Sequence, residues 1–210
     1  MSLASRTATA FALATFLAGS VGVAHAQGNA ERGKVLAQTC LGCHAVENYK
    51  NSYPTYPVPK LRGQHAEYLE VALRGYQAGE RSHATMHAHA ASLSEQEIAD
   101  IAAFLGGEAV QPTGKPAAAN APEAAAVCVA CHGNDGVGVL PAYPTLTGQH
   151  IEYLKRALTD YKSGARKNPI MAGFVATLSA KDIEALAAYY GKMGPGLETV
   201  ELRKSRFSAR

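Results

Sequence analysis

The sequence predicts an all-α protein of two tandem domains that are related by an internal repeat. The repeat itself is the first observation behind this prediction, since Gly-Gln-His-Ala-Glu-Tyr-Leu at residues 63–69 returns at residues 148–154 with one substitution. The same spacing relates positions on either side of it, such as Pro59 and Pro144. The second observation is that apolar residues recur at intervals of three and four in both halves, which is the period of a helix packed on one face.

The N-terminal segment has the composition of a leader. Arg6 precedes a mostly apolar run at residues 8–23, and small residues continue to Ala26. This order is typical of a secretory signal that is cleaved. A membrane anchor is the alternative, but the run is shorter than the roughly 20 apolar residues that a spanning helix needs. We therefore expect residues 1–26 to be removed and the mature protein to begin near Gln27.

The rest of the chain divides at a segment rich in proline, glycine and alanine. We expect a first domain at residues 27–106, an extended linker at 107–122, a second domain at 123–200 and a basic tail at 201–210. An ordered, packed connection is the alternative to an extended linker. Each domain is small for an independent hydrophobic core, and a large apolar group bound at its centre would supply what is missing.

Each domain is predicted to contain the same helices in the same order. The first helix runs into a cysteine motif, at residues 30–39 and, after Pro122, at residues 123–129. The second helix follows the repeated Gly-Gln-His. The third begins at Ser94 and at Ser179, where the next residues form capping boxes. The second helix is predicted to carry an apolar stripe, whose tyrosines are expected to pack in the core, with a redox relay as the alternative; the stripe comprises Tyr68, Leu69, Ala72, Leu73 and Tyr76, and in the repeat Tyr153, Leu154, Ala157, Leu158 and Tyr161. The buried face of the last helix is predicted to comprise Ile98, Ile101, Ala102 and Leu105, and in the repeat Ile183, Leu186, Ala187 and Tyr190.

The pattern Cys-x-x-Cys-His occurs twice, at residues 40–44 and 128–132, and the two copies use all four cysteines. On one helical turn, two thiols at this spacing reach the two vinyl groups of a haem, and the adjacent histidine lies beneath the iron. A zinc site built from both cysteine pairs and a thioredoxin-like thiol pair are the alternatives. Neither explains a histidine after both second cysteines, so the sequence predicts two covalently bound haem c groups. The predicted attachment residues are Cys40, Cys43, Cys128 and Cys131, and the predicted proximal iron ligands are His44 and His132.

Met86 and Met171 are the predicted sixth iron ligands. They occupy equivalent positions of the repeat, each a short distance before the Leu-Ser that starts the last helix. We expect them to lie in loops long enough to wrap the far face of each haem. Thioether ligation stabilises ferrous iron and raises the potential, which suits an electron carrier. A packing role is the alternative for each methionine.

A histidine cluster surrounds Met86 and has no counterpart around Met171. Its members, His83, His87 and His89, are expected to be exposed loop residues. The alternative is that one of them competes for iron, or links the potential of the first domain to protonation. The histidines of the repeated helix start, His65 and His150, are expected to cap or pack rather than to bind iron.

The charge of the chain does not favour a nucleic-acid partner. The sequence holds 20 Lys and Arg against 17 Asp and Glu, a formal net charge of +3. Loss of Arg6 with the leader and the gain of four haem propionates would make the holoprotein weakly acidic. The basic tail, with Arg203, Lys204, Arg206 and Arg210, is expected to be solvated, with transient association with a membrane surface or an acidic partner as the alternative. We identify no pair of carboxylates and no serine nucleophile that would indicate an enzyme.

The mature chain resembles the dihaem cytochrome c4 family of periplasmic electron carriers over nearly its whole length. The resemblance rests on the paired Cys-x-x-Cys-His motifs, the Gly-Gln-His helices, the two methionines and the Pro-x-Leu-x-Gly segments at residues 59–63 and 144–148. It implies two tandem cytochrome c-like haem domains. The second domain fits the family closely. The first departs from it at residues 45–50, where a glycine-rich turn is expected.

The resemblance also implies further site residues and partners. The carbonyl groups of Pro59 and Pro144 should accept hydrogen bonds from His44 and His132 and so orient the two imidazoles. The partners it implies are quinol-oxidising membrane complexes, terminal oxidases and periplasmic dehydrogenases.

We therefore expect a periplasmic protein that passes single electrons between respiratory donors and acceptors and has no catalytic residues of its own. Two other classes stay open on the sequence. One is a dihaem redox enzyme, a peroxidase or a thiosulfate-oxidising cytochrome, with an exchangeable axial site in the first domain. The other is a ligand-sensing or haem-delivery module, which also requires an open iron.

Overall fold

The computed structural model describes residues 27–53, 55–115 and 120–201. The signal peptide predicted at residues 1–26 and most of the predicted basic tail, residues 202–210, lie outside the described residues. Among the residues that are described, no helix is long and apolar enough to cross a membrane.

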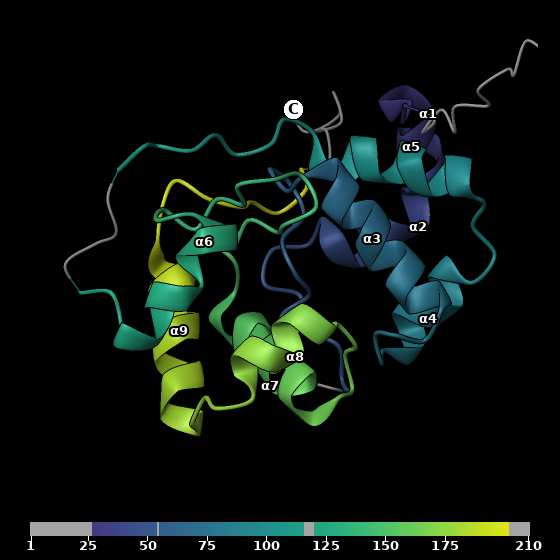
Figure 1. The fold of residues 1–210 in the computed structure, drawn as a ribbon. Coiled ribbons are helices and arrows are strands. Elements are labelled where there is room, and N and C mark those ends of the chain that lie inside the picture. Colours follow the sequence, from purple (N-terminus) through teal and green to yellow (C-terminus); the bar gives the residue numbers. More distant parts are fainter. Residues whose placement is uncertain (1–26, 54, 116–119, 202–210) are drawn as a thin grey trace, which may run out of the picture.

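Helices joined by loops make up the described part of the chain, which confirms the all-α fold class (Figure 1). No β-sheet forms in these ranges, where only isolated bridges such as Lys50 with Pro57 occur. The elements are α1 (Ala30–Leu36), α2 (Gln38–His44), α3 (Ala66–Gln77), α4 (Ala84–Ala90), α5 (Glu95–Gly106), the 3-10 helix η1 (Glu123–Val127), α6 (Val129–His132), α7 (Ile151–Ser163), α8 (Pro169–Val175) and α9 (Ala180–Lys192).

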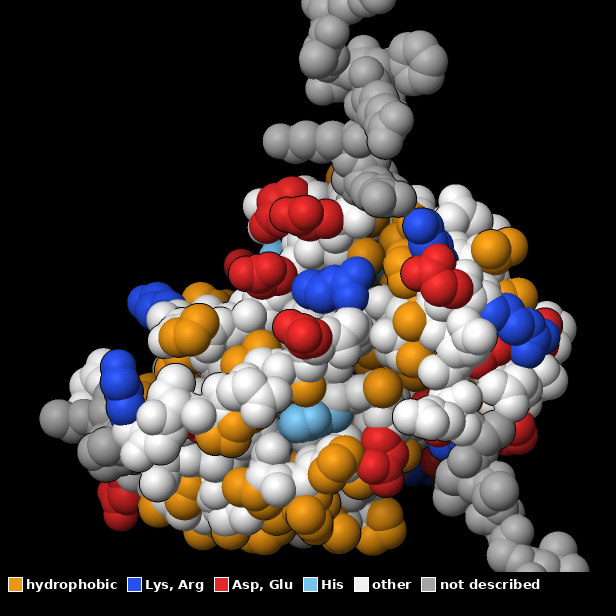
Figure 2. All heavy atoms as spheres, turned by 90° about the horizontal axis from the view of Figure 1, so that it is seen from above, with side chains coloured by type: hydrophobic (Ala, Val, Ile, Leu, Met, Phe, Trp, Pro, Cys, Tyr) orange, Lys and Arg blue, Asp and Glu red, His pale blue; other side chains and the backbone are white. Residues whose placement is uncertain are grey.

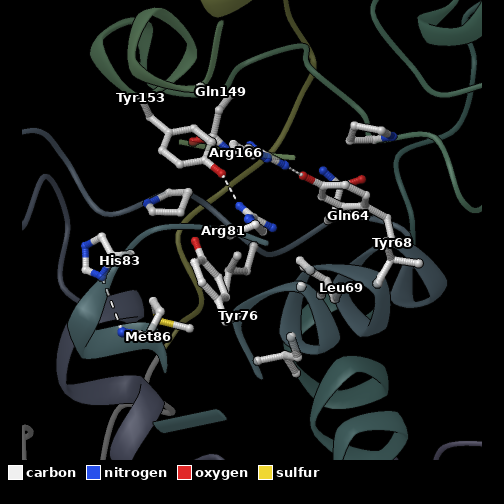
Figure 3. A pocket seen from close by; sticks show the side chains of 18 of the residues that line it. Gln64, Tyr68, Leu69, Tyr76, Arg81, His83, Met86, Gln149, Tyr153 and Arg166 are labelled. Atoms are coloured by element: carbon white, nitrogen blue, oxygen red, sulfur yellow. Dashed lines mark hydrogen bonds between the residues drawn. The ribbon is translucent and has the colours of Figure 1, made fainter. Parts of the chain in front are cut away.

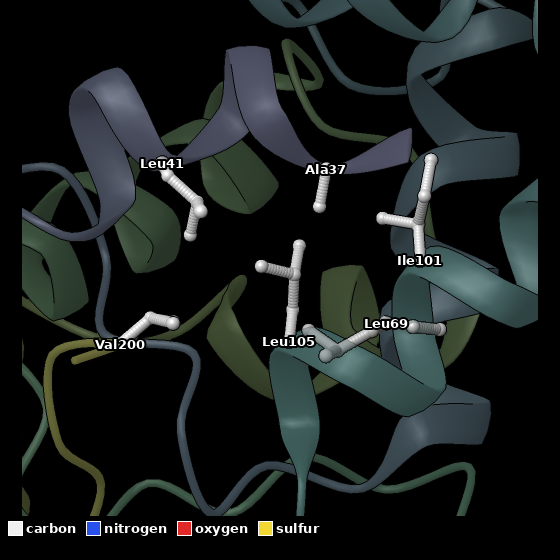
Figure 4. Close-up of a cluster of buried hydrophobic side chains, with 7 residues drawn as sticks. Ala37, Leu41, Leu69, Ile101, Leu105 and Val200 are labelled. Atoms are coloured by element: carbon white, nitrogen blue, oxygen red, sulfur yellow. The ribbon is translucent and has the colours of Figure 1, made fainter. Parts of the chain in front are cut away.

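In the first half of the chain, α5 is the central packing element. Both α1 and α3 pack against it, and α4 packs against α3. The helix begins at Ser94, whose hydroxyl accepts a hydrogen bond from the Glu97 N–H while the Glu97 carboxylate accepts from the Ser94 N–H, as the capping box predicts. Its apolar face is buried as expected. Figure 4 shows the resulting cluster, which comprises Ala37, Leu41, Leu69, Ile101, Ala102, Leu105 and Val200.

The second half repeats this arrangement with a smaller core. Helix α9 packs against α7 and η1, and it begins with a capping box formed by Ser179 and Asp182. The buried cluster comprises Ala125, Leu154, Leu186, Ala187 and Tyr190. Each half therefore has its own helix pair and its own core, as the internal repeat predicts.

The first predicted helix of each half differs from expectation. Residues 30–39 do not form one helix, because Ala37 leaves helical geometry and separates α1 from α2. Ala37 is fully buried in the cluster of Figure 4, so the break lies where the chain packs against the core. In the repeat, the segment from Glu123 is a 3-10 helix that passes into the short α6.

The end of the second half returns to the first half. Glu198 pairs with Arg62 through two backbone hydrogen bonds of 3.0 Å, and the Val200 N–H donates to the His44 carbonyl. Val200 is fully buried in the core of the first half. This stretch is the yellow segment that runs back across the molecule in Figure 1. The segment that we assigned to the second domain thus supplies a core residue to the first.

The described part of the linker contacts both halves of the molecule. The Val110 N–H donates to the Gly63 carbonyl in the first half, and Thr113 donates from its N–H and its hydroxyl to Asp135 in the second half. The connection is therefore packed at these points rather than extended throughout.

Gly33 on α1 lies directly against the backbone of α5, and this contact leads to a first prediction. A side-chain carbon at Gly33 would overlap the backbone carbonyl of Asp100. Gly33→Ala should therefore lower the free energy of unfolding of the holoprotein by about 1–3 kcal/mol, measured by urea denaturation. Gly173→Ala is the matched control, since Gly173 lies in α8 with open space around it and should be unchanged or slightly stabilised. Equal stability of the two variants would contradict this packing.

Asp100 gives a second prediction, on pH. Its fully buried carboxylate accepts hydrogen bonds from the Asn29 N–H at 2.7 Å, from Gln96 at 2.9 Å and from Arg32 at 2.9 Å. The Asn29 N–H is the main cause that lowers the pKa of Asp100, and it outweighs the opposing effect of burial. A carboxyl with a lowered native pKa stabilises the fold above its unfolded pKa of about 3.9, and this stabilisation is lost as the pH falls through the native value.

Asp100→Asn should consequently lower the free energy of unfolding by about 1–3 kcal/mol at pH 7. The difference from the unmodified protein should shrink as the pH falls from about 4 through the lowered native pKa of Asp100, because below that pKa both proteins carry an uncharged group. Urea denaturation at a series of pH values measures this. A difference that stays constant into the acid range would contradict the role assigned to the carboxylate.

Candidate haem sites

The first cysteine motif lies on α2, where one helical turn carries Cys40, Cys43 and His44. The His44 ring is buried, and its Nδ1–H donates to the Pro59 carbonyl at 3.0 Å. Because a carbonyl only accepts, this bond fixes the tautomer and leaves Nε2 with a free lone pair. Burial lowers the pKa of His44 to about 4 against the opposing hydrogen bond to Pro59. The ring is thus a neutral imidazole, the form that binds a metal.

The second motif has the same geometry on a different local structure. Cys128 ends η1, and Cys131 and His132 lie on α6. The buried His132 donates from Nδ1 to the Pro144 carbonyl at 2.9 Å. Burial lowers the pKa of this imidazole as well. Gly133 follows with a φ of 70°, a conformation that turns the chain directly after the ligand without side-chain strain.

The two methionines lie on short helices, and the expectation of loops at these positions was wrong. Met86 is on α4 and Met171 is on α8. The reason is a side-chain N-cap on each helix: His83 accepts a hydrogen bond from the Met86 N–H at 3.3 Å, and Asn168 accepts from the Met171 N–H at 3.0 Å. His83 and Asn168 are equivalent in the repeat, so His83 has a structural counterpart although Asn168 is not a histidine.

Three further histidines, His65, His150 and His87, do not point to an iron-binding role. The His65 ring donates to the Gly138 carbonyl in the opposite half of the molecule at 3.2 Å, and His150 is at the N-cap position of α7 without a side-chain capping bond. His87 is exposed, and its Nδ1 donates to the Tyr76 carbonyl at 2.7 Å.

One cavity connects the two sites, with a volume of about 360 Å³. Its walls are mostly apolar, and the four cysteines that line it are free thiols. Figure 3 shows the part of this cavity that lies between the two halves. The predicted site residues that line it are Cys40, Cys43, His44, Pro59 and Met86 from the first half, and Cys128, Cys131, His132, Pro144 and Met171 from the second.

These residues fit a haem c in each half. Free thiols, a neutral imidazole with a free Nε2 and a thioether line an apolar space, which is the donor set that such a group requires. The zinc alternative has no matching geometry, because in residues 27–53, 55–115 and 120–201 no group of three or more His, Cys, Asp or Glu side chains is arranged so that it could hold a metal ion.

Two buried arginines meet at the centre of the cavity, and the sequence analysis missed their role. Arg81 and Arg166 are equivalent in the repeat and form an isolated antiparallel bridge with each other. Arg81 donates to the Tyr153 hydroxyl at 3.0 Å, and Arg166 donates to the Tyr68 hydroxyl at 2.7 Å. Each guanidinium thus bonds a tyrosine of the opposite half (Figure 3). The recurrence of both arginines in the repeat was the available signal, but it does not reveal a contact between the two copies.

The centre of the cavity carries excess positive charge. Arg81 and Arg166 are 9% and 8% exposed, and neither pairs with a carboxylate in the described part of the chain. Burial alone would raise the pKa of Tyr68, but Arg166 and Arg81 lower it below its ordinary value. Buried cations of this kind require an anionic partner, and carboxylate groups match the fork of a guanidinium. The carboxylates of haem propionates have this chemistry.

Two Cys-x-x-Cys-His motifs whose buried, neutral histidines face one cavity are the site of a dihaem c-type cytochrome. The family described as "Cytochrome c" matches residues 30–107, and the family described as "Cytochrome C oxidase, cbb3-type, subunit III" matches residues 116–189. Cytochrome c4 of Pseudomonas aeruginosa is 36% identical over 192 residues, which cover 81% of this chain and 92% of that protein. The chain therefore belongs to the cytochrome c4 family, the dihaem electron-transfer cytochromes with two covalently bound haem c groups.

Two further similarities agree with this. The crystal structure of reduced recombinant cytochrome c4 from Pseudomonas stutzeri matches with a TM-score of 0.64 at 32% identity, covering 80% of this chain and all of that one. The thiosulfate dehydrogenase electron acceptor of Stutzerimonas stutzeri is 30% identical, covering 81% of this chain and 84% of that protein. The fold is thus shared with a protein of known structure.

Proposed function

We propose that each half of the chain holds one haem c through its own motif. Cys40 and Cys43 attach the first haem, with His44 below the iron. The second half uses the equivalent residues Cys128, Cys131 and His132. When bound, each haem supplies a one-electron couple between ferric and ferrous iron. The hydrogen bonds from the two histidines to Pro59 and Pro144 support this, because they fix each ring with Nε2 free.

Met86 and Met171 are proposed as the sixth ligands. Each thioether lines the cavity, and each helix that carries it is fixed by a side-chain cap from the residue three positions earlier. Two protein ligands per iron would limit rearrangement during electron transfer and leave no position for a substrate. This favours an electron carrier over an enzyme.

Arg81 and Arg166 are proposed to bind the propionates. They are buried, they line the cavity, and the ion pairs of the described residues do not include them. Tyr68 and Tyr153 hold the guanidiniums in place by accepting a hydrogen bond from each. The anionic ends of both haems would therefore face the contact between the halves.

The single observation that carries the proposed function is that both donor sets open into one cavity. A single cavity with a ligand set at either side brings the two haems close enough for an electron to pass from one to the other inside the protein. We propose that the protein carries single electrons in the periplasm between respiratory donors and acceptors.

The partners proposed are a quinol-oxidising complex, a terminal oxidase or a periplasmic dehydrogenase. Figure 2 shows acidic and basic side chains intermixed on one face, with hydrophobic side chains between them. A surface of mixed charge permits brief docking without strong attraction of one sign. The relative from Stutzerimonas stutzeri is described as the electron acceptor of a dehydrogenase, which supports a partner of that class.

Carbon monoxide binding to the reduced holoprotein tests the function. We expect no rapid binding at either haem, and two one-electron steps in a spectropotentiometric titration. The alternative is a dihaem enzyme with an exchangeable site in the first half, where His83 and His89 line the cavity near Met86. Rapid, stoichiometric binding of carbon monoxide at one haem would contradict the carrier and favour that enzyme.

A further inference from the structure

Two buried glutamines cross between the halves of the molecule in a reciprocal pattern. Gln64, just before α3, donates from Nε2 to the Thr145 carbonyl and accepts at Oε1 from the Thr145 N–H, both at 2.9 Å. Gln149, just before α7, donates to the Lys60 carbonyl at 3.0 Å and accepts from the Lys60 N–H at 2.9 Å. Their side chains are 3% and 5% exposed. Both glutamines line the same cavity as the arginine pair (Figure 3).

The peptide groups that the glutamines contact are the same ones that orient the axial histidines. The Pro144 carbonyl and the Thr145 N–H belong to one peptide group. Its oxygen accepts from His132 at 2.9 Å, and its N–H donates to Gln64 at 2.9 Å. A continuous hydrogen-bonded chain thus runs from the His132 ring, through one peptide, to a side chain of the opposite half.

The equivalent series of hydrogen bonds exists at the histidine of the first half. The peptide between Pro59 and Lys60 accepts from His44 at 3.0 Å and donates to Gln149 at 2.9 Å. Each histidine is therefore linked, through one peptide group, to a glutamine of the other half.

Further hydrogen bonds within the protein hold the glutamine side chains in this orientation. The Gln64 oxygen also accepts from the His65 N–H at 3.1 Å, and the Gln149 oxygen accepts from the His150 N–H at 3.0 Å. Thr145 is 1% exposed, so water does not compete for its N–H. A hydrogen bond to a peptide N–H polarises the carbonyl of the same peptide and makes it a stronger acceptor.

We propose that Gln64 is a positioning residue for His132 and that Gln149 is one for His44, so that each half tunes the iron of the other. A stronger carbonyl acceptor makes the imidazole a better electron donor to iron, which favours the ferric state. This proposal rests on the proposed function, because it takes both histidines to be iron ligands.

The test uses the electron-exchange equilibrium between the two haems in the holoprotein. Gln64→Met removes the acceptor for Thr145 N–H at similar side-chain volume. It should favour reduction of the second haem. The equilibrium constant for moving one electron from the first haem to the second, called the exchange constant, should therefore rise several-fold. Gln149→Met should favour reduction of the first haem, so that the exchange constant falls several-fold. Spectropotentiometric titration gives the two potentials, and NMR of the haem methyl groups assigns each potential to its half.

Two further variants distinguish a specific effect on the haem potentials from a general loss of stability. Gln111→Met is the matched control, since the exposed Gln111 donates only to a nearby backbone carbonyl, and it should change neither potential. Gln64→Glu keeps an acceptor for Thr145 N–H and should not shift the constant toward the second haem. Because this variant keeps the side-chain length, it also provides a test where Gln64→Met does not fold.

The outcomes are distinct. Opposite shifts in Gln64→Met and Gln149→Met support the proposal. Shifts of the same sign in the two variants, or unchanged potentials, would overturn it while leaving the proposed function intact. Absence of two histidine-ligated haems in the unmodified protein would instead refute the proposed function.

Discussion

Met171→Ala is expected to open one haem iron of the two to carbon monoxide, with one molecule bound per reduced polypeptide. The thioether would be lost from the far side of the second haem, and no other side chain is proposed to replace it. The potential of that haem should fall, because the thioether stabilises ferrous iron. The free energy of unfolding should fall by about 2–5 kcal/mol as well, as for other methionine truncations at packed sites. Carbon monoxide titration followed by absorbance measures the binding.

Met193→Ala is the matched control for this experiment. Met193 caps the end of α9 and packs against the buried cluster of the second half, but it does not line the cavity. This variant should lose stability without binding carbon monoxide. Equal behaviour of the two variants, or retention of both methionine-ligation spectra in Met171→Ala, would contradict the ligand assignment.

Arg166→Met is expected to have the largest effect on stability. The proposed propionate partner would lose its buried cation, and an uncompensated buried charge costs about 3–5 kcal/mol. Loss of positive charge beside a haem should also lower its potential. The potential should become more dependent on pH, because a carboxylate without its partner takes up a proton more readily. Urea denaturation and titrations at several pH values measure the two effects.

Arg74→Met provides the comparison on the surface. Arg74 pairs with Glu70 and Glu95, and its side chain is about a third exposed. Such a pair contributes at most about 1 kcal/mol, and its loss should leave both potentials unchanged. If Arg166→Met were no more destabilising than Arg74→Met, the assignment of Arg166 to a buried anion would be wrong.

The sequence was informative wherever the chemistry depends on local spacing. The Cys-x-x-Cys-His turns, the capping boxes at Ser94 and Ser179 and the helical stripes are local patterns, and the fold class and the internal repeat follow from them. The helices that carry Met86 and Met171 were both missed. The first is capped by His83, and histidine is not among the usual N-cap residues, whereas the Asn168-Pro169 start of the second was a usable signal.

Contacts between the two halves could not be predicted in the same way. The repeat pairs Arg81 with Arg166 and Gln64 with Gln149 as equivalent positions. Equivalence in the repeat does not show which residues of the two halves are in contact. Val200 shows the same limit, since its burial in the first half depends on a chain reversal at the end of the second. Long-range partners of this kind are set by tertiary packing rather than by local pattern.

Two haem c groups, each held by a histidine and a methionine of this chain, are the basis of the proposed function. The most direct measurement is the near-infrared magnetic circular dichroism of the oxidised holoprotein, with haem quantified per polypeptide. We predict two covalently bound haems per polypeptide, both with the charge-transfer signature of histidine–methionine ligation. One such signature, or none, would contradict the claim.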